Sequence, residues 1–299
     1  MRLRCGIVAA RQPMIATKPT SDHHVHTSAS HCCKERYGPV DAWNAAMARG
    51  IEHLGITDHD VPFHNGYLQS HARAMAGKQG LLLGLEVSIR DEHGRIQVAK
   101  RDLERLDYVL LAEHVHVMPA TTFLRKGRKA FASWWSDPAM QHLVEKFYDR
   151  HARMTCAALE RNRVDVLAHP WRFPWHQGIL DKASLQISER VVRKAVERGV
   201  KIEVSRVIMN IVRREPGTGD GRIVDAAMFP PWKGSMEHEI LTPSAFFREY
   251  FEMCRQFGAT FTLGSDAHKI ADIGNFNDID AFLLATGLRE RDIIQALKD

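Results

Sequence analysis

The sequence predicts an α/β fold, a closed or nearly closed seven-stranded β/α barrel of the TIM type. Seven short runs typical of β-strands alternate with helical stretches along the 299 residues, and nothing repeats at a fixed period. Six of these runs end at or near a His, Asp or Glu, and the seventh carries Glu203 late in its length. Because active sites of β/α barrels lie at the C-terminal ends of the strands, we expect these side chains to converge on one metal site there.

An open, doubly wound parallel sheet is the alternative fold. It would place ligands at one topological switch point rather than at six strand ends. The sequence also has no Gly-rich phosphate loop of the dinucleotide or P-loop type. We therefore favour the barrel.

The first expected strand is Ser21–Thr27, where alternation sends His24 and His26 to the same face. A helix follows over Pro39–Arg49, with a proline near its start and Gly50 as its stop.

The run Leu81–Ile89 is apolar enough for a strand buried on both faces, and Glu86 lies inside it. Ile89–Val98, with Gly94 at its turn, is expected to form a hairpin. The stretches 117–137 and 205–242 show no regular pattern and are expected to be irregular.

The remaining elements follow from the same periodicities. The other expected strands are His53–Thr57, Asp107–Ala112, Val164–Ala168, Val200–Val204 and Ala259–Leu263, and the other expected helices are about Leu68–Ala76, about Pro138–Arg161, Ser184–Arg198 and Pro243–Gln256, with two short helices at the end.

Composition indicates a globular, soluble protein, with 44% hydrophobic and 26% charged residues and no run near the roughly 18 apolar residues of a membrane span. We expect residues 1–20 to be an N-terminal extension without a secretory signal and residues 21–299 to form one domain. Five cysteines without a disulfide or zinc-finger spacing indicate reduced thiols and a cytoplasmic location.

The net charge of +5 fits an anionic substrate. Nucleic acid is an unlikely partner on this evidence, because the chain has no block of like charges and no nucleic-acid motif. The sequence does not determine the oligomeric state.

Nine side chains are candidate metal ligands, and they exceed what one four- to six-coordinate ion uses, so two or three divalent metal ions (Zn, Mn or Fe) are expected. They are His24, His26, His31, His59, Glu86, His114, His169, Asp266 and His268. Glu86 is the expected bridging ligand, since it is the one buried carboxylate with a central position.

The ordered motifs that contain these residues resemble the polymerase and histidinol phosphatase (PHP) family. The motifs are His24-Val-His26-Thr, Thr57-Asp58-His59, Gly84-Leu85-Glu86, Asp107 through His114, Ala168-His169-Pro170 and Gly264-Ser265-Asp266-Ala267-His268. The resemblance spans roughly residues 21 to 269 and implies a distorted seven-stranded (β/α)7 barrel, usually with three metal ions.

The resemblance also implies how the ligands are shared. One ion would take His24, His26, Glu86 and Asp266; a second would take Glu86, His114 and His169; a third would take His31, His59 and His268. His116 is an alternative to His114.

The activity implied by the resemblance is hydrolysis of a small phosphomonoester, by attack of a metal-bridging hydroxide on phosphorus. Arg172 is the candidate for holding the phosphoryl oxygens, with a salt bridge at the rim as its alternative role. Asp58 is expected to orient a ligand histidine rather than to act as a ligand or general acid. Trp171 follows His169-Pro170 where histidinol phosphatases often have Asp, which disfavours histidinol phosphate as the substrate.

Two other activities remain open. A phosphodiesterase or nuclease of the same fold would need a cleft open at both sides. A metal-dependent amide or lactone hydrolase would need no cationic group beside the metals.

Overall fold

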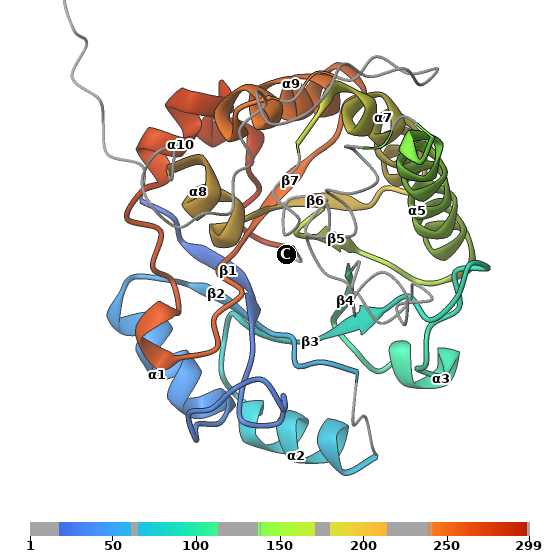
Figure 1. The fold of residues 1–299 in the computed structure, drawn as a ribbon. Coiled ribbons are helices and arrows are strands. Elements are labelled where there is room, and N and C mark those ends of the chain that lie inside the picture. Colours follow the sequence, from blue (N-terminus) through green and yellow to red (C-terminus); the bar gives the residue numbers. More distant parts are fainter. Residues whose placement is uncertain are drawn as a thin grey trace, which may run out of the picture.

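Seven parallel strands form a ring in which each strand pairs with the next one along the chain (Figure 1). The computed structural model describes residues 18–60, 65–112, 137, 139–170, 180–213, 239 and 241–297. The strands are β1 (Ser21–Val25), β2 (His53–Ile56), β3 (Leu81–Ser88), β4 (Tyr108–Ala112), β5 (Val166–Ala168), β6 (Lys201–Ser205) and β7 (Phe261–Gly264).

The ring closes between β1 and the residues that follow β7. Val25 pairs with Ala267 in parallel, and the His26 backbone N–H donates to the Ala267 carbonyl at 3.0 Å. The buried Asp22 carboxylate reinforces the seam by accepting the backbone N–H groups of Ser265 and Gly274, at 2.9 and 2.8 Å. The barrel is thus confirmed, and the open doubly wound sheet is excluded.

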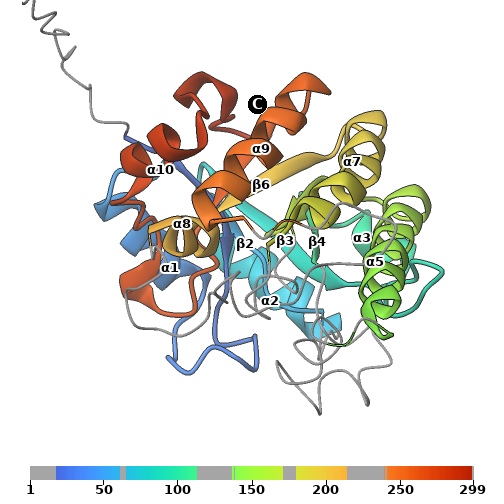
Figure 2. The same ribbon diagram turned by 45° about the horizontal axis from the view of Figure 1, so that its top comes forward.

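Helices surround the ring of strands (Figures 1 and 2). They are α1 (Pro39–Ala48), α2 (Asn65–Met75), α3 (Lys100–Leu103), α5 (Gln141–Arg161), α7 (Lys182–Glu197), α8 (Arg206–Arg213), α9 (Pro243–Gln256) and α10 (Ile279–Thr286), with short 3₁₀ turns η3 (Ile270–Asp272) and η4 (Glu290–Asp292). Of the helices described, none is both long and apolar enough to cross a membrane.

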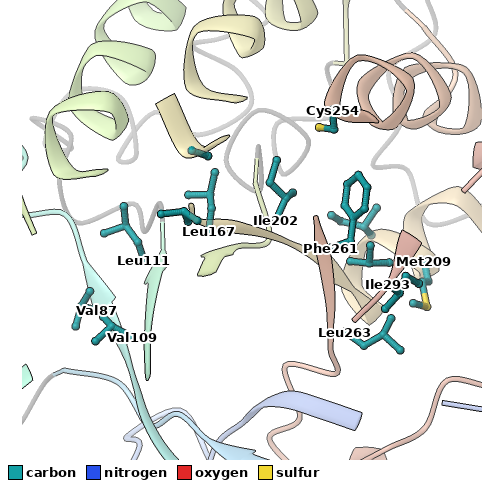
Figure 3. Close-up of a cluster of buried hydrophobic side chains, with 14 of the residues drawn as sticks. Val87, Val109, Leu111, Leu167, Ile202, Met209, Cys254, Phe261, Leu263 and Ile293 are labelled. Atoms are coloured by element: carbon teal, nitrogen blue, oxygen red, sulfur yellow. The ribbon is translucent and has the colours of Figure 1, made fainter. Parts of the chain in front are cut away.

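Alternation along the strands separates two apolar regions. In β4, Val109 and Leu111 belong to the large core between the strands and the helices, whereas Tyr108 and Leu110 form a smaller cluster with Val166 of β5. Figure 3 shows side chains of the larger core, which bury the outer surface of the sheet. The strands therefore bury apolar side chains on both faces, which matches the apolar run predicted for β3.

Two glycines make room for the Tyr108 ring. A Cβ on Gly84 would lie 2.7 Å from Tyr108 Cζ, and one on Gly55 would overlap the phenol oxygen. The phenol donates to the backbone carbonyl of His23 at 2.6 Å.

The C-terminal segment lies at the end of the barrel where the strands begin. The Ile294 backbone N–H donates to the carbonyl of Phe261, the first residue of β7, at 2.9 Å. Gln295 Oε1 accepts from the backbone N–H of Thr20, just before β1, at 3.2 Å. The opposite end, where the strands finish, is left for the site.

Two expectations about elements are wrong. Residues 89–98 form a turn rather than a hairpin of strands, because the Asp91 side chain accepts the backbone N–H groups of His93 and Arg95 and holds the chain locally. The region after β6 is not irregular throughout. It begins with α8, whose Ile208, Met209 and Val212 are buried along one face.

Candidate metal centre

Glu86, completely buried in β3, lies at the centre of the strand ends. Its Oε1 lies 2.8 Å from His169 Nε2 and 3.4 Å from His24 Nε2. Its Oε2 lies 2.8 Å from His59 Nδ1 and 3.5 Å from His26 Nε2. One carboxylate therefore contacts imidazoles that come from the ends of β1, β2 and β5, an arrangement suited to a bridging ligand.

Asp266, just after β7, adds a second carboxylate. Its Oδ1 lies 3.2 Å from His26 Nε2 and 3.6 Å from His24 Nε2, while the two Nε2 atoms are 3.2 Å apart. A tetrahedral ion with bonds of 2.0–2.3 Å separates its ligand atoms by about 3.3–3.8 Å. The spacing of these three atoms thus fits ligands around one metal ion.

Glu203 of β6 fixes the orientation of His24. Glu203 Oε1 accepts from His24 Nδ1 at 2.7 Å, and Glu203 Oε2 accepts the backbone N–H of His169 at 2.6 Å. Because Nδ1 carries the proton, the lone pair of His24 is on Nε2, which faces the two carboxylates Glu86 and Asp266.

Ser30 does the same for His26. The Ser30 hydroxyl donates to Asp58 Oδ1 at 2.6 Å, so its oxygen is left to accept from His26 Nδ1 at 3.0 Å and from the His59 backbone N–H at 3.0 Å. Asp58 also accepts from the backbone N–H and hydroxyl of Thr27, both at 2.7 Å. Asp58 thus lies behind the histidines rather than among the inward-facing ligand atoms.

A third group of potential ligands lies beside the first two. It combines His26, His59 and His268 with Cys32, and the ligand atoms lie within 4.8 Å of one another. The imidazole of His268 lies 3.0 Å from Cys32 Sγ through its Nε2 atom. His31 is exposed and is not in this group, although its ring lies 5.7 Å from that of His59, centroid to centroid.

Two of the candidate ligands have a backbone conformation that non-glycine residues rarely adopt. The φ angle is 26° at His169, which directly follows β5, and 52° at Asp266, which lies two residues after β7. Such conformations persist where the surroundings over-determine them, and they are concentrated in functional sites.

The charges of the cluster depend on the balance between burial and the carboxylates. Burial lowers the pKa of His24, but Glu203, Glu86 and Asp266 outweigh it and raise that pKa well above its usual value. Burial prevails at His26, whose pKa falls to about 4. Burial also opposes the charged form of His59, but Glu86 and Cys32 raise its pKa to about 10. The Cys32 thiol, despite burial, has a pKa lowered to about 6 by His268 and His59.

The positions of these side chains fit metal ions, because imidazole nitrogens, carboxylates and a thiolate are the ligands that Zn, Mn and Fe use in proteins. The structure groups the candidate ligands as His24–Glu86–His169, His24–His26–Asp266 and His26–Cys32–His59–His268. The groups share His24 and His26, so they describe one extended cluster.

The structure brings together seven of the nine sequence-predicted ligands, and it places His31 at the edge of the cluster. The seven are His24, His26, His59, Glu86, His169, Asp266 and His268. His114, its alternative His116, and Arg172 lie outside the described residues.

The sequence did not predict the roles of three residues of the site. The thiol of Cys32 joins the third group, while Glu203 and Ser30 hold the ring nitrogens of His24 and His26. The sequence contains one indication for Glu203, which is an acidic residue late in a largely apolar strand. No feature of the sequence distinguishes Cys32 and Ser30 from the other small residues of the same loop.

Comparison with known proteins shows distant similarity to phosphatases. No protein-family model matches the chain. A probable phosphatase of Edwardsiella ictaluri is 26% identical over 265 residues, covering 86% of this chain and 81% of that protein. A probable phosphatase of Acetivibrio thermocellus is 26% identical over 269 residues, covering 86% of this chain and 83% of that protein.

A solved structure is similar in fold. Histidinol phosphate phosphatase of Lactococcus lactis, complexed with zinc, L-histidinol and phosphate, superimposes with a TM-score of 0.50 and 12% identity, covering 90% of this chain and 94% of that one. At that identity the superposition supports the barrel fold alone. Together with the relatives, these findings support a phosphatase built on a β/α barrel with a His, Glu and Asp cluster that could bind metal.

Proposed function

We propose that the protein is a metal-dependent phosphoesterase of the PHP type that hydrolyses a small phosphomonoester. The observation that carries the proposal is the convergence of ligand atoms from separate strand ends on Glu86. Burial of Glu86 favours positive charge beside it, in keeping with the raised pKa of His24 and of His59, and bound divalent cations would supply such charge.

The ligand spacing supports a division among the ions. We assign one ion to His24, His26 and Asp266 with Glu86, and a second to Glu86 and His169 with His114 as the ligand predicted from sequence. Bound at these positions, divalent ions would lower the pKa of a water molecule and neutralise charge on phosphoryl oxygens.

The chain itself prepares the ligands. Glu203 and Ser30 keep the protons of His24 and His26 on Nδ1, so that the lone pairs on Nε2 face the cluster without rearrangement. We further propose that Arg172, by its position after His169, binds the phosphoryl oxygens of the substrate. We propose that Asp58 is a positioning residue, because its contacts are with the groups that hold His26 and His59.

A phosphomonoester is supported by the relatives, which carry the name probable phosphatase, and by the fold neighbour, which was solved with phosphate. The net charge of +5 agrees with an anionic substrate. A cytoplasmic location is part of the proposal, since Cys32 and Cys33 are half-buried free cysteines, and free thiols are typical of a reducing compartment.

The test is phosphate release from a panel of phosphomonoesters by protein reconstituted with Zn, Mn or Fe. Phosphodiesters and amide or lactone substrates are assayed in parallel. The Glu86→Gln variant is the control, because it keeps the side-chain shape while removing the bridging charge. Release from one class of monoester, lost in Glu86→Gln, is the expected result. Turnover of only the diester or only the amide or lactone substrates would contradict the proposal.

A further inference from the structure

The hydrogen bonding of His268 determines which of its nitrogens can bind a metal. Its Nδ1 lies 2.8 Å from the backbone carbonyl of Asp266. A carbonyl oxygen only accepts, so Nδ1 carries the proton and the lone pair is on Nε2. That nitrogen faces the Cys32 sulfur at 3.0 Å. A nitrogen lone pair and a thiol thus point at each other at the edge of the cluster.

His26 is not expected to bind the same ion as Cys32 and His268, although its ring stacks on that of His268 with centroids 4.2 Å apart. Its Nδ1 is hydrogen-bonded to Ser30, so only Nε2 is available, and one nitrogen binds one ion. The closest carboxylate to this Nε2 is that of Asp266, at 3.2 Å, which assigns it to the ion of His24 and Asp266. The potential ligands that remain for a separate ion are Cys32, His59 and His268.

The two cysteines of the loop differ in what their sulfurs contact. Cys33 Sγ donates to the backbone carbonyls of Glu35 and His268, at 3.4 and 3.3 Å, so its thiol keeps its proton. Cys32 Sγ instead contacts an imidazole nitrogen. Only Cys32 of this pair is therefore placed as a ligand.

We propose that the third metal site of this protein is a mixed thiolate and imidazole site, formed by Cys32, His59 and His268, and that His31 is not a ligand. The proposal refines the metal centre of the proposed function. Three protein ligands leave a fourth position open, as in catalytic rather than structural zinc sites. A thiolate favours Zn or Fe over Mn at this position, since Mn prefers oxygen ligands.

Substitution with Co²⁺ tests the proposal without an activity assay. A cysteine thiolate bound to Co²⁺ gives a sulfur-to-metal charge-transfer band in the near ultraviolet, which imidazole and carboxylate ligands do not give. We expect this band in the wild-type protein, unchanged in the Cys33→Ser and His31→Ala variants and lost in Cys32→Ser. The variant Cys32→His should lose the band but keep the Co²⁺ stoichiometry, because imidazole replaces the thiolate as a ligand.

Three results would overturn the proposal: no band in wild-type protein that has bound cobalt, a band that survives Cys32→Ser, or loss of one metal ion in His31→Ala. Phosphatase activity is measured on the same samples. A band without turnover of any phosphoester would sustain the thiolate site and contradict the proposed function. Turnover of a phosphoester without a band would support the proposed function and contradict the thiolate site.

Discussion

The side chains of His24 and Glu203 are joined by a buried hydrogen bond of 2.7 Å between Nδ1 and Oε1, and the other Glu203 oxygen accepts the backbone N–H of His169. One carboxylate on β6 therefore orients two candidate ligands that come from β1 and from the end of β5. Such partners behind the ligands raise ligand basicity and fix the tautomer.

The Glu203→Gln variant is expected to bind metal roughly 10- to 100-fold more weakly, because partners of ligand histidines typically contribute that much to affinity. Competition with a fluorescent chelator measures the affinity. Glu249→Gln, an exposed change on α9, is the matched control and should bind as the wild type does. Equal affinity in both variants would remove Glu203 from the metal centre.

Replacing Ser30 with Ala should destabilise the loop after β1, since three groups lose the hydroxyl as a partner: the buried His26 Nδ1, one buried Asp58 oxygen and the part-buried His59 backbone N–H. We expect a loss of about 1–3 kcal/mol in the free energy of unfolding, measured by denaturant titration. The control is Ser28→Ala in the same loop, whose hydroxyl is exposed and donates only to the Tyr37 carbonyl. A Ser30 variant as stable as the Ser28 variant would show that this network does not hold the loop.

Gly264→Ala should damage the metal centre by adding a single methyl group. The new Cβ would overlap Glu203 Oε1 and come within 2.6 Å of His24 Cβ. Overpacking of this kind costs about 1–3 kcal/mol in stability, and here it also displaces the carboxylate that orients His24. Thermal unfolding and metal titration should both change. Gly38→Ala is the control, because an added Cβ there meets nothing closer than 4.0 Å and the backbone is extended, and this variant should bind metal normally.

Arg172→Ala should leave the metal content intact and raise KM for a phosphate ester, because the predicted role of this guanidinium is to bind the substrate's phosphoryl oxygens. Steady-state kinetics and elemental analysis on the same preparation separate the two effects. Unchanged kinetics would place Arg172 outside the site.

The barrel and most of the cluster were predictable because each depends on local patterns. Strand and helix periodicities give the seven units, and a polar residue at the end of an apolar strand is visible without knowing its neighbours. Parallel strands then bring those ends together, as with Glu86 and His169. This is why seven ligand candidates from different motifs lie in one cluster.

The parts that sequence reasoning missed depend on how the loop after β1 turns. His31 and Cys32 are adjacent and both can bind metal, so the sequence does not separate them. The turn held by the hydrogen bonds of Ser30 to Asp58 and His59 places the Cys32 side chain in the cluster and leaves His31 exposed. Likewise, the role of Glu203 appears only when β6 is placed next to β5 and β7.

The most direct test of the metal centre is the metal stoichiometry of untagged protein, measured by elemental analysis for the wild type and for Glu86→Ala. We predict two or three ions per chain in the wild type and the loss of two of them in the variant, because Glu86 is the proposed bridging ligand of two sites. Fewer than about one ion per wild-type chain after reconstitution with Zn or Mn, or an unchanged count in Glu86→Ala, would contradict this prediction.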